Sequence, residues 1–210
     1  IGARKATPYG RDVAFKFAKI ASEHGVTIIS GGALGCDSAA HRGCLEGGSP
    51  TVVVLGGGCD CIYPESNRDL FQEIIDKGGA VISEHQWQFP PMPYTFRARN
   101  RIIAGLSRAT LIVEAGLPSG TFSTADDALS SNREVLVVPG AITSPTSRGA
   151  NRLLYQGATP IVDQETFEDV IFNLYGCLKV QDMRKKEVGE TSLLFAALQA
   201  EQLSIDALME

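Results

Sequence analysis

The chain has 210 residues, of which 44% are apolar and 20% charged, the composition of a globular protein with one α/β domain and room for a small appendage. No apolar run is long enough to span a membrane, so we expect no membrane partner. The net charge of -5 argues against general attraction to nucleic acid but is compatible with a local basic patch.

Cysteine usage indicates a cytoplasmic protein without a structural metal. The five cysteines form no regular framework, and an odd number in a domain of this size is typical of reduced thiols in the cytosol. Cys59 and Cys61 are separated by one residue, whereas zinc and redox pairs usually have two residues between them. We therefore expect no metal site and no cofactor.

Apolar periodicity predicts alternating strands and helices along most of the chain. We expect Ile1 to end a strand whose start is missing, and a helix over residues 10–24 to end at Gly25. Short apolar runs predict strands at 26–30, 51–55, 80–83, 110–114, 134–138 and 159–162. Helices are expected at 38–46, 69–77, 121–129, 147–156 and 165–174, with a loop at 86–94 and a helical second half in 96–107. This order favours a doubly wound, mostly parallel sheet with helices on both faces.

The last part of the chain differs in composition from the α/β region, which we assign to residues 1–175. Residues 176–190 are crowded with charged side chains and lack apolar periodicity, so we predict a linker there. Two short amphipathic segments in 191–210 are too few to form a core. We expect them to begin a second domain that is cut short.

Residues 30–41 form a glycine-rich turn between a predicted strand and a predicted helix. Glycine lets the backbone approach a ligand, and a helix N-terminus favours an anion, so the turn is typical of a phosphate site, although a tight corner is the alternative. Two more glycine turns, at 56–58 and 118–121, also follow strands. Ligands of such sheets bind beyond the carboxyl ends of the strands, where all three turns should converge.

Basic residues are expected at the same edge. Arg4 and Lys5 follow the first strand, and we expect Arg4 to contact phosphate, with a salt bridge to Asp37 as the alternative. Arg97, Arg99 and Arg101 cannot all face one way on a helix or an extended arm, so one of them should be a structural anchor. A solvated position is an equal alternative for Arg97, whereas the neighbouring apolar residues favour a functional role for Arg99, Asn100 and Arg101.

Several other residues have a structural and a functional interpretation. Ser119 and Thr121 can offer hydroxyl and backbone donors to phosphate at a helix start. The aromatic rings of Trp87, Tyr94 and Phe96 can stack on bases or pack the arm. We expect His41 to brace the glycine turn, and Asp37 to cap the helix rather than act as a base.

Separated blocks of this sequence resemble the DNA-processing protein A family, also called DprA or Smf, over residues 1–175. The blocks occur in the same order as in the family: Gly2-Ala3-Arg4-Lys5-Ala6-Thr7 with Tyr9-Gly10, residues 30–37 with Ala40-His41, Val54-Leu55-Gly56 with Ile62-Tyr63-Pro64 and Asn67, residues 99–107, Ser119-Gly120 with Thr124-Ala125, and residues 133–135 through 138–140 to 149–151.

The resemblance implies an extended Rossmann-like fold that binds single-stranded DNA without cleaving it. It also implies a homodimer that loads the RecA recombinase during natural transformation and recombination, and a winged-helix domain whose beginning resembles residues 194–208. Residues 30–41 would then cradle a polymer. The expected DNA-binding residues are Arg4, Lys5, Ser30, Gly31, Gly35, Arg97, Arg99, Asn100, Arg101, Ser119, Gly120 and Thr121.

Two departures from the family pattern concern the expected DNA site. Ala3 stands where a serine is usual, so a hydroxyl is lost. Glu65 stands where some members have a basic residue, which removes the basis for a phosphate contact at that position.

An enzyme is the competing hypothesis. Residues 118–126 are similar to the turn of the Lonely Guy nucleotide phosphoribohydrolases, whose motif is Pro-Gly-Gly-x-Gly-Thr-x-x-Glu. This chain has Ser119 and Asp126 where that motif has glycine and glutamate, and no nucleophile–base pair is evident. We therefore expect a binding protein and no enzyme.

Overall fold

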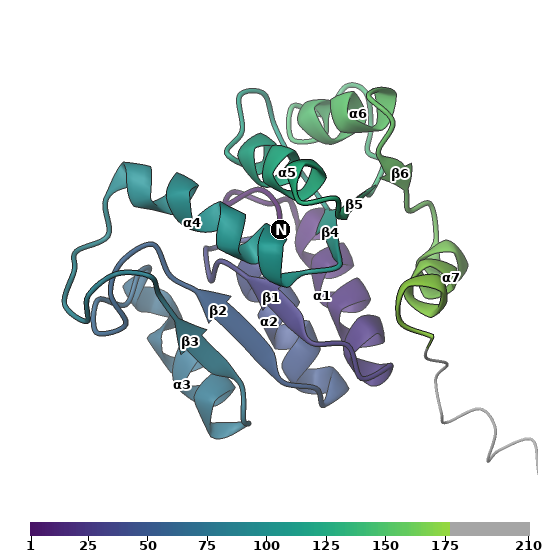
Figure 1. Ribbon diagram of the computed structural model, residues 1–210. Helices are drawn as coiled ribbons and strands as arrows, with labels where there is room; N and C mark the ends of the chain where they lie inside the picture. The colour runs from purple at the N-terminus through teal and green to yellow at the C-terminus, as the bar shows by residue number, and fades with distance from the viewer. Residues whose placement is uncertain (177–210) are drawn as a thin grey trace, which may run out of the picture. The chain divides into compact units, whose positions relative to one another are not determined.

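The computed structural model describes residues 1–176, in which strands and helices alternate (Figure 1). The elements are α1 (Pro8–Glu23), β1 (Ile28–Ser30), α2 (Cys36–Gly47), β2 (Thr51–Val54), η1 (Glu65–Asn67), α3 (Arg68–Asp76), β3 (Ala80–Ile82), α4 (Pro93–Leu106), β4 (Ala109–Ile112), α5 (Thr121–Ser130), β5 (Glu134–Val137), α6 (Arg148–Tyr155), β6 (Thr159–Pro160) and α7 (Gln164–Tyr175).

The expected elements are present, and several helices, including α2 and α4, begin earlier than predicted. The helix α2 starts at Cys36, with Gly35 as its N-cap. The helix α4 starts at Pro93, inside the segment expected to be a loop, because proline is well suited to the first turn of a helix. The whole basic segment is therefore helical.

The strands form two parallel three-stranded sheets, in the orders β1-β2-β3 and β4-β5-β6. The amino group of Ile1 donates to the Leu111 carbonyl at 2.8 Å, and the Ile1 carbonyl accepts from the Val113 N–H at 3.1 Å. This alternation is the hydrogen-bond pattern of a parallel neighbour of β4. A cavity of about 470 Å³, lined mainly by apolar residues of β1, β4, α1, α4 and α7, lies between the sheets. A strand ending at Ile1 stays a prediction.

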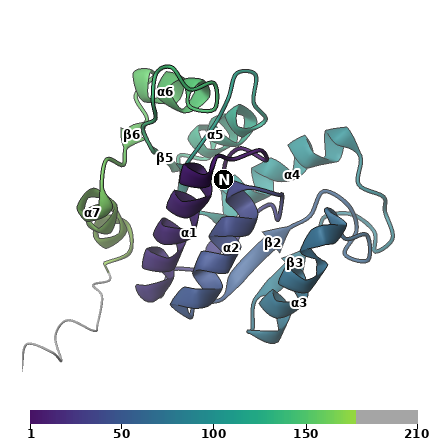
Figure 2. The same ribbon diagram turned by 180° about the vertical axis from the view of Figure 1, so that it is seen from behind.

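Helices cover both faces of the sheets, so the doubly wound, Rossmann-like architecture is confirmed. Figures 1 and 2 show α1, α2 and α3 on one side of β1–β3 and α4 on the other. The strand β5 alternates in the same way: Val135 and Val137 pack with residues of α5 and α6, whereas Leu136 packs with residues of α1 and α7.

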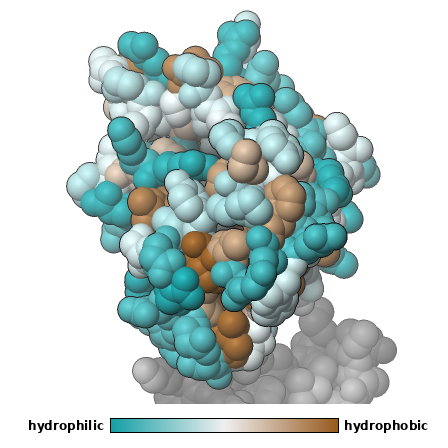
Figure 3. Space-filling view, turned by 90° about the vertical axis from the view of Figure 1, so that its left-hand side faces the viewer, coloured by the Kyte–Doolittle hydropathy of each residue, from teal (hydrophilic) through white to brown (hydrophobic). Residues whose placement is uncertain are grey.

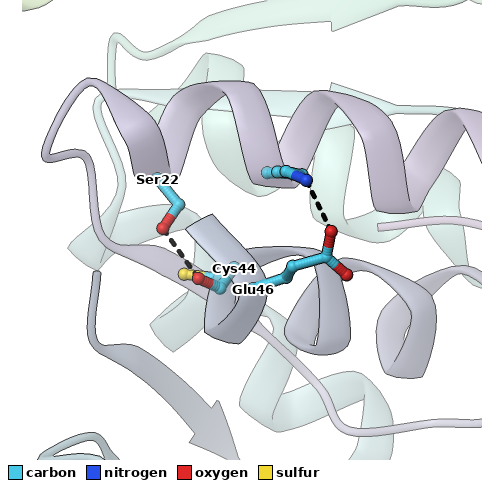
Figure 4. Close-up of polar contacts among 4 residues, drawn as sticks. Ser22, Cys44 and Glu46 are labelled. Carbon is cyan, nitrogen blue, oxygen red and sulfur yellow. Dashed lines mark hydrogen bonds and ion pairs between the residues drawn. The ribbon is translucent and has the colours of Figure 1, made fainter. Parts of the chain in front are cut away.

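Polar contacts join the C-terminal halves of α1 and α2. The hydroxyl of Ser22 donates to the Cys44 carbonyl at 2.7 Å, and Lys19 pairs with Glu46 (Figure 4). The Ser22 bond is buried, whereas the ion pair is exposed and contributes little to stability.

The predicted linker beyond Gly176 and the predicted start of a winged-helix domain at 191–210 lie outside the described residues. Within residues 1–176, no helix is long and apolar enough to cross a membrane.

Candidate functional site

A cavity of about 650 Å³ lies where the N-terminal segment, α4 and the turn before α5 meet. One face of α4 forms a wall, because residues spaced three or four apart on a helix point the same way. Eight predicted site residues line the cavity: Arg4, Lys5, Arg97, Arg99, Asn100, Ser119, Gly120 and Thr121. Four others do not: Ser30, Gly31, Gly35 and Arg101. Figure 3 shows the side with the N-terminal end of α4 and the loops after β2 and β3, which is mainly hydrophilic with small apolar patches.

Three cations at this cavity are exposed. Arg4, Lys5 and Arg97 have no ion-pair partner within residues 1–176, so the alternative salt bridge from Arg4 to Asp37 does not form. The Arg4 guanidinium lies 5.0 Å from the centre of the Phe96 ring, which contacts the Tyr63 ring at 5.4 Å. An aromatic face holds a guanidinium without neutralising its charge.

The three arginines of α4 have three different environments. Arg97 is exposed at the cavity, whereas Arg101 lies outside it and pairs with Glu84. Arg99 is buried, and its Nη1 donates to the carbonyl oxygens of Gly31, at 2.8 Å, and Val54. The pKa of Arg99 is lowered, mainly by burial. The nearby Asp37 carboxylate opposes this change, and the charge of Arg4 adds to it. Arg99 is thus the structural anchor that the alternating arginines predicted.

The first glycine turn faces the protein more than the cavity. Ser30 is buried, and the N–H groups of Cys36 and Ser38 donate to the carbonyls of Ala3 at 3.3 Å and Ala33 at 3.1 Å. These donors of the first turn of α2 are therefore occupied. Asp37 lies inside that turn and accepts from the Ala33 N–H at 3.3 Å, so the expectation that it caps the helix was wrong.

The other two glycine turns differ in their access to the cavity. Gly120 is the N-cap of α5, and the Ser119 hydroxyl there donates to Thr121 Oγ1 at 2.9 Å. The second turn is covered instead, because Gly58 N–H donates to the Phe89 carbonyl at 2.8 Å and Asp60 N–H to the Trp87 carbonyl at 3.0 Å. Of the three turns, the one before α5 is the most open to a ligand.

Asn100 joins α4 to the turn before α5. Its Nδ2 donates to the Ser123 hydroxyl at 3.0 Å, which donates to the Gly120 carbonyl at 2.8 Å. Its Oδ1 accepts from Arg99 Nε at 3.2 Å. Asn100 therefore links two walls of the cavity.

Sequence reasoning did not identify Glu114, a buried carboxylate close to the cavity. It accepts from the backbone N–H of Thr7 at 2.9 Å, the Thr7 hydroxyl at 2.7 Å and the Thr146 hydroxyl at 3.2 Å. It thereby joins the N-terminus of α1 to the loop that contributes Pro145 and Thr146 to the cavity. An acidic residue directly after an apolar strand was the available signal.

His41 links α2 to β2 in the core. It is fully buried in α2, and its Nδ1 lies 2.8 Å from Thr51 Oγ1 on β2. Burial lowers its pKa to about 4, so the imidazole is neutral at pH 7. Its burial favours a structural role over catalysis, and a bracing contact with the glycine turn stays a prediction.

The site has the chemistry of an anion-binding surface. Exposed cations, a half-buried ring and hydroxyl groups surround an open cavity at the carboxyl edge of parallel strands. Within residues 1–176, no cluster of three His, Cys, Asp or Glu side chains could hold a metal ion. Fold and site together define a Rossmann-like domain with a cationic cavity.

The chain belongs to the DNA recombination-mediator protein A family, whose model matches residues 1–173. It is 39% identical over 176 residues to the protein Smf of Escherichia coli K12, and the aligned region covers 83% of this chain and 47% of that protein. It is 40% identical over 136 residues to the DNA processing protein DprA of Streptococcus pneumoniae R6, covering 65% of this chain and 48% of that protein. The chain thus spans about half the length of these curated relatives.

Solved structures agree with this assignment. DNA processing protein A from Streptococcus pneumoniae matches with a TM-score of 0.73 and 34% identity, over 79% of this chain and 58% of that one. DNA processing protein A from Helicobacter pylori, whose structure was described for its single-stranded DNA binding mode, matches with a TM-score of 0.74 and 32% identity. The match covers 84% of this chain and 78% of that one. A molybdenum cofactor carrier protein from Chlamydomonas reinhardtii, at 21% identity and a TM-score of 0.56, shares the fold.

Proposed function

We propose that the described domain binds single-stranded DNA through the cavity between the N-terminal segment, α4 and the start of α5. The observation that carries the proposal is the set of three exposed cations without ion-pair partners in residues 1–176, Arg4, Lys5 and Arg97, around one open cavity. The single-stranded DNA binding mode of the Helicobacter pylori relative supports it.

Phosphate groups would contact these cations and the Thr121 hydroxyl, because the Ser119 hydroxyl and the Thr121 N–H already bond within the turn. Phe96, whose ring carries the Arg4 guanidinium, offers its remaining face to a base. Three neutralised phosphates on a single strand predict a slope of about −2 for the logarithm of the binding constant against that of the salt concentration. Backbone contacts of this kind give slight sequence preference.

We infer binding without catalysis. Asp126, at the position of the phosphoribohydrolase glutamate, is exposed and does not line the cavity. The carboxylate of Asp37 faces the Ala33 N–H, and Glu114 is occupied by Thr7 and Thr146. These contacts favour structural roles for the acidic groups near the site.

Beyond the described domain, we propose that the protein acts in the cytoplasm as a homodimer that protects incoming DNA and helps load RecA in transformation and recombination. Membership of the family supports this role. Because the chain spans about half of its curated relatives, the role concerns the whole protein.

Binding to labelled oligo-dT and to matching duplex at several salt concentrations tests the proposal. We expect preference for the single strand, and Arg4→Ala should weaken binding by about tenfold or more and make the salt slope shallower by about 0.7. Equal binding of duplex, or an unchanged slope in the variant, would contradict it. Release of a free base from a nucleoside monophosphate would favour the enzyme instead.

A further inference from the structure

Arg99 connects the ends of two strands beneath the site. Arg99 uses three of its five N–H donors in these contacts. Two on Nη1 donate to the Gly31 and Val54 carbonyls, and the one on Nε donates to Asn100 Oδ1. Gly31 follows the last residue of β1, and Val54 is the last residue of β2. With 4% of its surface exposed, Arg99 faces protein carbonyls more than solvent.

The turn held by Arg99 supports the Ala3–Arg4 backbone on its other side. A Cβ atom at Gly31 would lie 2.1 Å from Arg99 Nη2, and one at Gly35 would lie 2.3 Å from the Ala3 carbonyl oxygen. The Cys36 N–H donates to the same carbonyl. The turn is therefore packed between a buried guanidinium and the backbone that carries Arg4.

A second, neutral side chain holds the same turn. Asn67 is buried, and its Nδ2 donates to the Gly32 carbonyl at 2.9 Å. Consecutive carbonyls, at Gly31 and Gly32, are thus each held by a side chain. A displacement of either side chain would be passed to the turn, because closely packed interiors transmit strain.

We propose that Arg99 is a positioning residue that acts through Arg4: it holds the glycine turn in the conformation that supports Arg4, and it does not itself bind DNA phosphate. Asn67 has the same role from the other side of the turn. The inference rests on the proposed DNA-binding function, and it makes the turn a support for Arg4 in place of a phosphate cradle.

A double-mutant cycle between positions 4 and 99 separates this role from a direct contact, because residues that act through one another are not additive. In the wild-type background, Arg99→Gln should weaken binding to labelled oligo-dT by about tenfold. In the Arg4→Ala background it should weaken binding by less than about twofold. Arg97→Ala is the matched control, since Arg97 lines the cavity but does not touch the turn, and its effect should add to that of Arg99→Gln.

Arg99→Lys tests the need for the guanidinium. Lysine keeps the charge and binds phosphate well, but it lacks the planar fork that reaches two carbonyls. Binding should therefore fall nearly as far as in Arg99→Gln. If Arg99→Gln does not fold, Asn67→Ala takes its place in the cycle and is expected to show the same dependence on Arg4.

Additive losses at positions 4 and 99, wild-type affinity in Arg99→Lys, or unchanged binding in a folded Arg99→Gln or Asn67→Ala protein would overturn the proposal. Amide hydrogen exchange gives a readout without DNA, and faster exchange at residues 31–36 is expected in the variants. Unchanged exchange there would also overturn it. A wild-type protein that does not bind oligo-dT would instead refute the proposed function.

Discussion

Folding stability should fall on acidification because His41 must stay uncharged in the folded protein. Thr51 Oγ1 donates its single hydrogen to the Ile28 carbonyl at 2.7 Å, so His41 Nδ1 is the donor in its bond to Thr51. The other ring nitrogen, Nε2, is buried and has no hydrogen-bond partner within residues 1–176. A proton there would place an unpaired charge in the core.

The pKa of His41 sets both the pH window and the size of the effect. Burial lowers this pKa from 6.5 to about 4, while Asp37 opposes the change. Above pH 6.5 both folded and unfolded chains are neutral at this position, and the stability is fully present. Between pH 6.5 and about 4 the unfolded chain binds the proton more readily, so about 3 kcal/mol of stability is lost.

Urea unfolding of the wild type and His41→Gln between pH 7 and about 4 measures this loss. The variant should be less stable than the wild type near neutrality, because the imidazole contacts are gone. The difference between the two free energies of unfolding should narrow by about 3 kcal/mol toward pH 4. Parallel curves for the wild type and His41→Gln would refute the reasoning.

Three further predictions concern stability and are measured by urea or thermal unfolding. Gly48→Ala should lower the free energy of unfolding by about 1–2 kcal/mol, because Gly48 has a positive φ. Gly35→Ala should lower it further, because Gly35 also has a positive φ and its new Cβ would meet the Ala3 carbonyl; equal losses would contradict this. Glu114→Gln should lower the free energy of unfolding by about 1–3 kcal/mol, because an NH2 group replaces one acceptor oxygen and faces either the Thr7 N–H or the two hydroxyls; an unchanged midpoint would contradict this. Lys19→Ala should leave the unfolding midpoint almost unchanged, since its pair with Glu46 is exposed, and a clear fall in the midpoint would contradict this.

Element order could be predicted because short apolar strands and amphipathic helices have different periods. The run at 51–55 is apolar because β2 is covered on both faces, by α2 and α3 on one side and α4 on the other. The division into two sheets could not be predicted, since it depends on which strand edges meet. The early start of α4 was missed because proline and aromatic residues at 89–94 resemble a loop.

For the α4 arginines, the sequence predicts that one is an anchor but not which one. Helical spacing places Arg99 on the side of α4 opposite to Arg97 and Arg101, so the need for an anchor was visible in the sequence. Which of them is the anchor depends on the Gly31 and Val54 carbonyls, which are distant in sequence and meet Arg99 only in the folded chain. The partner of Arg101, Glu84, is likewise set by the loop after β3.

The glycine turn after β1 has the composition of a phosphate site for a reason other than phosphate binding. Close approach requires glycine whether the approaching group is a ligand or another part of the chain. Here the neighbours of Gly31 and Gly35 are Arg99 and the Ala3 carbonyl, and the first N–H of α2 donates to that carbonyl. A glycine-rich turn between strand and helix therefore indicates a crowded backbone, and only the contacts of its N–H groups distinguish a ligand site from a support. In the turn before α5 the Thr121 N–H likewise donates to the Ser119 hydroxyl, so the exposed cations Arg4, Lys5 and Arg97 are the groups to test first for anion binding.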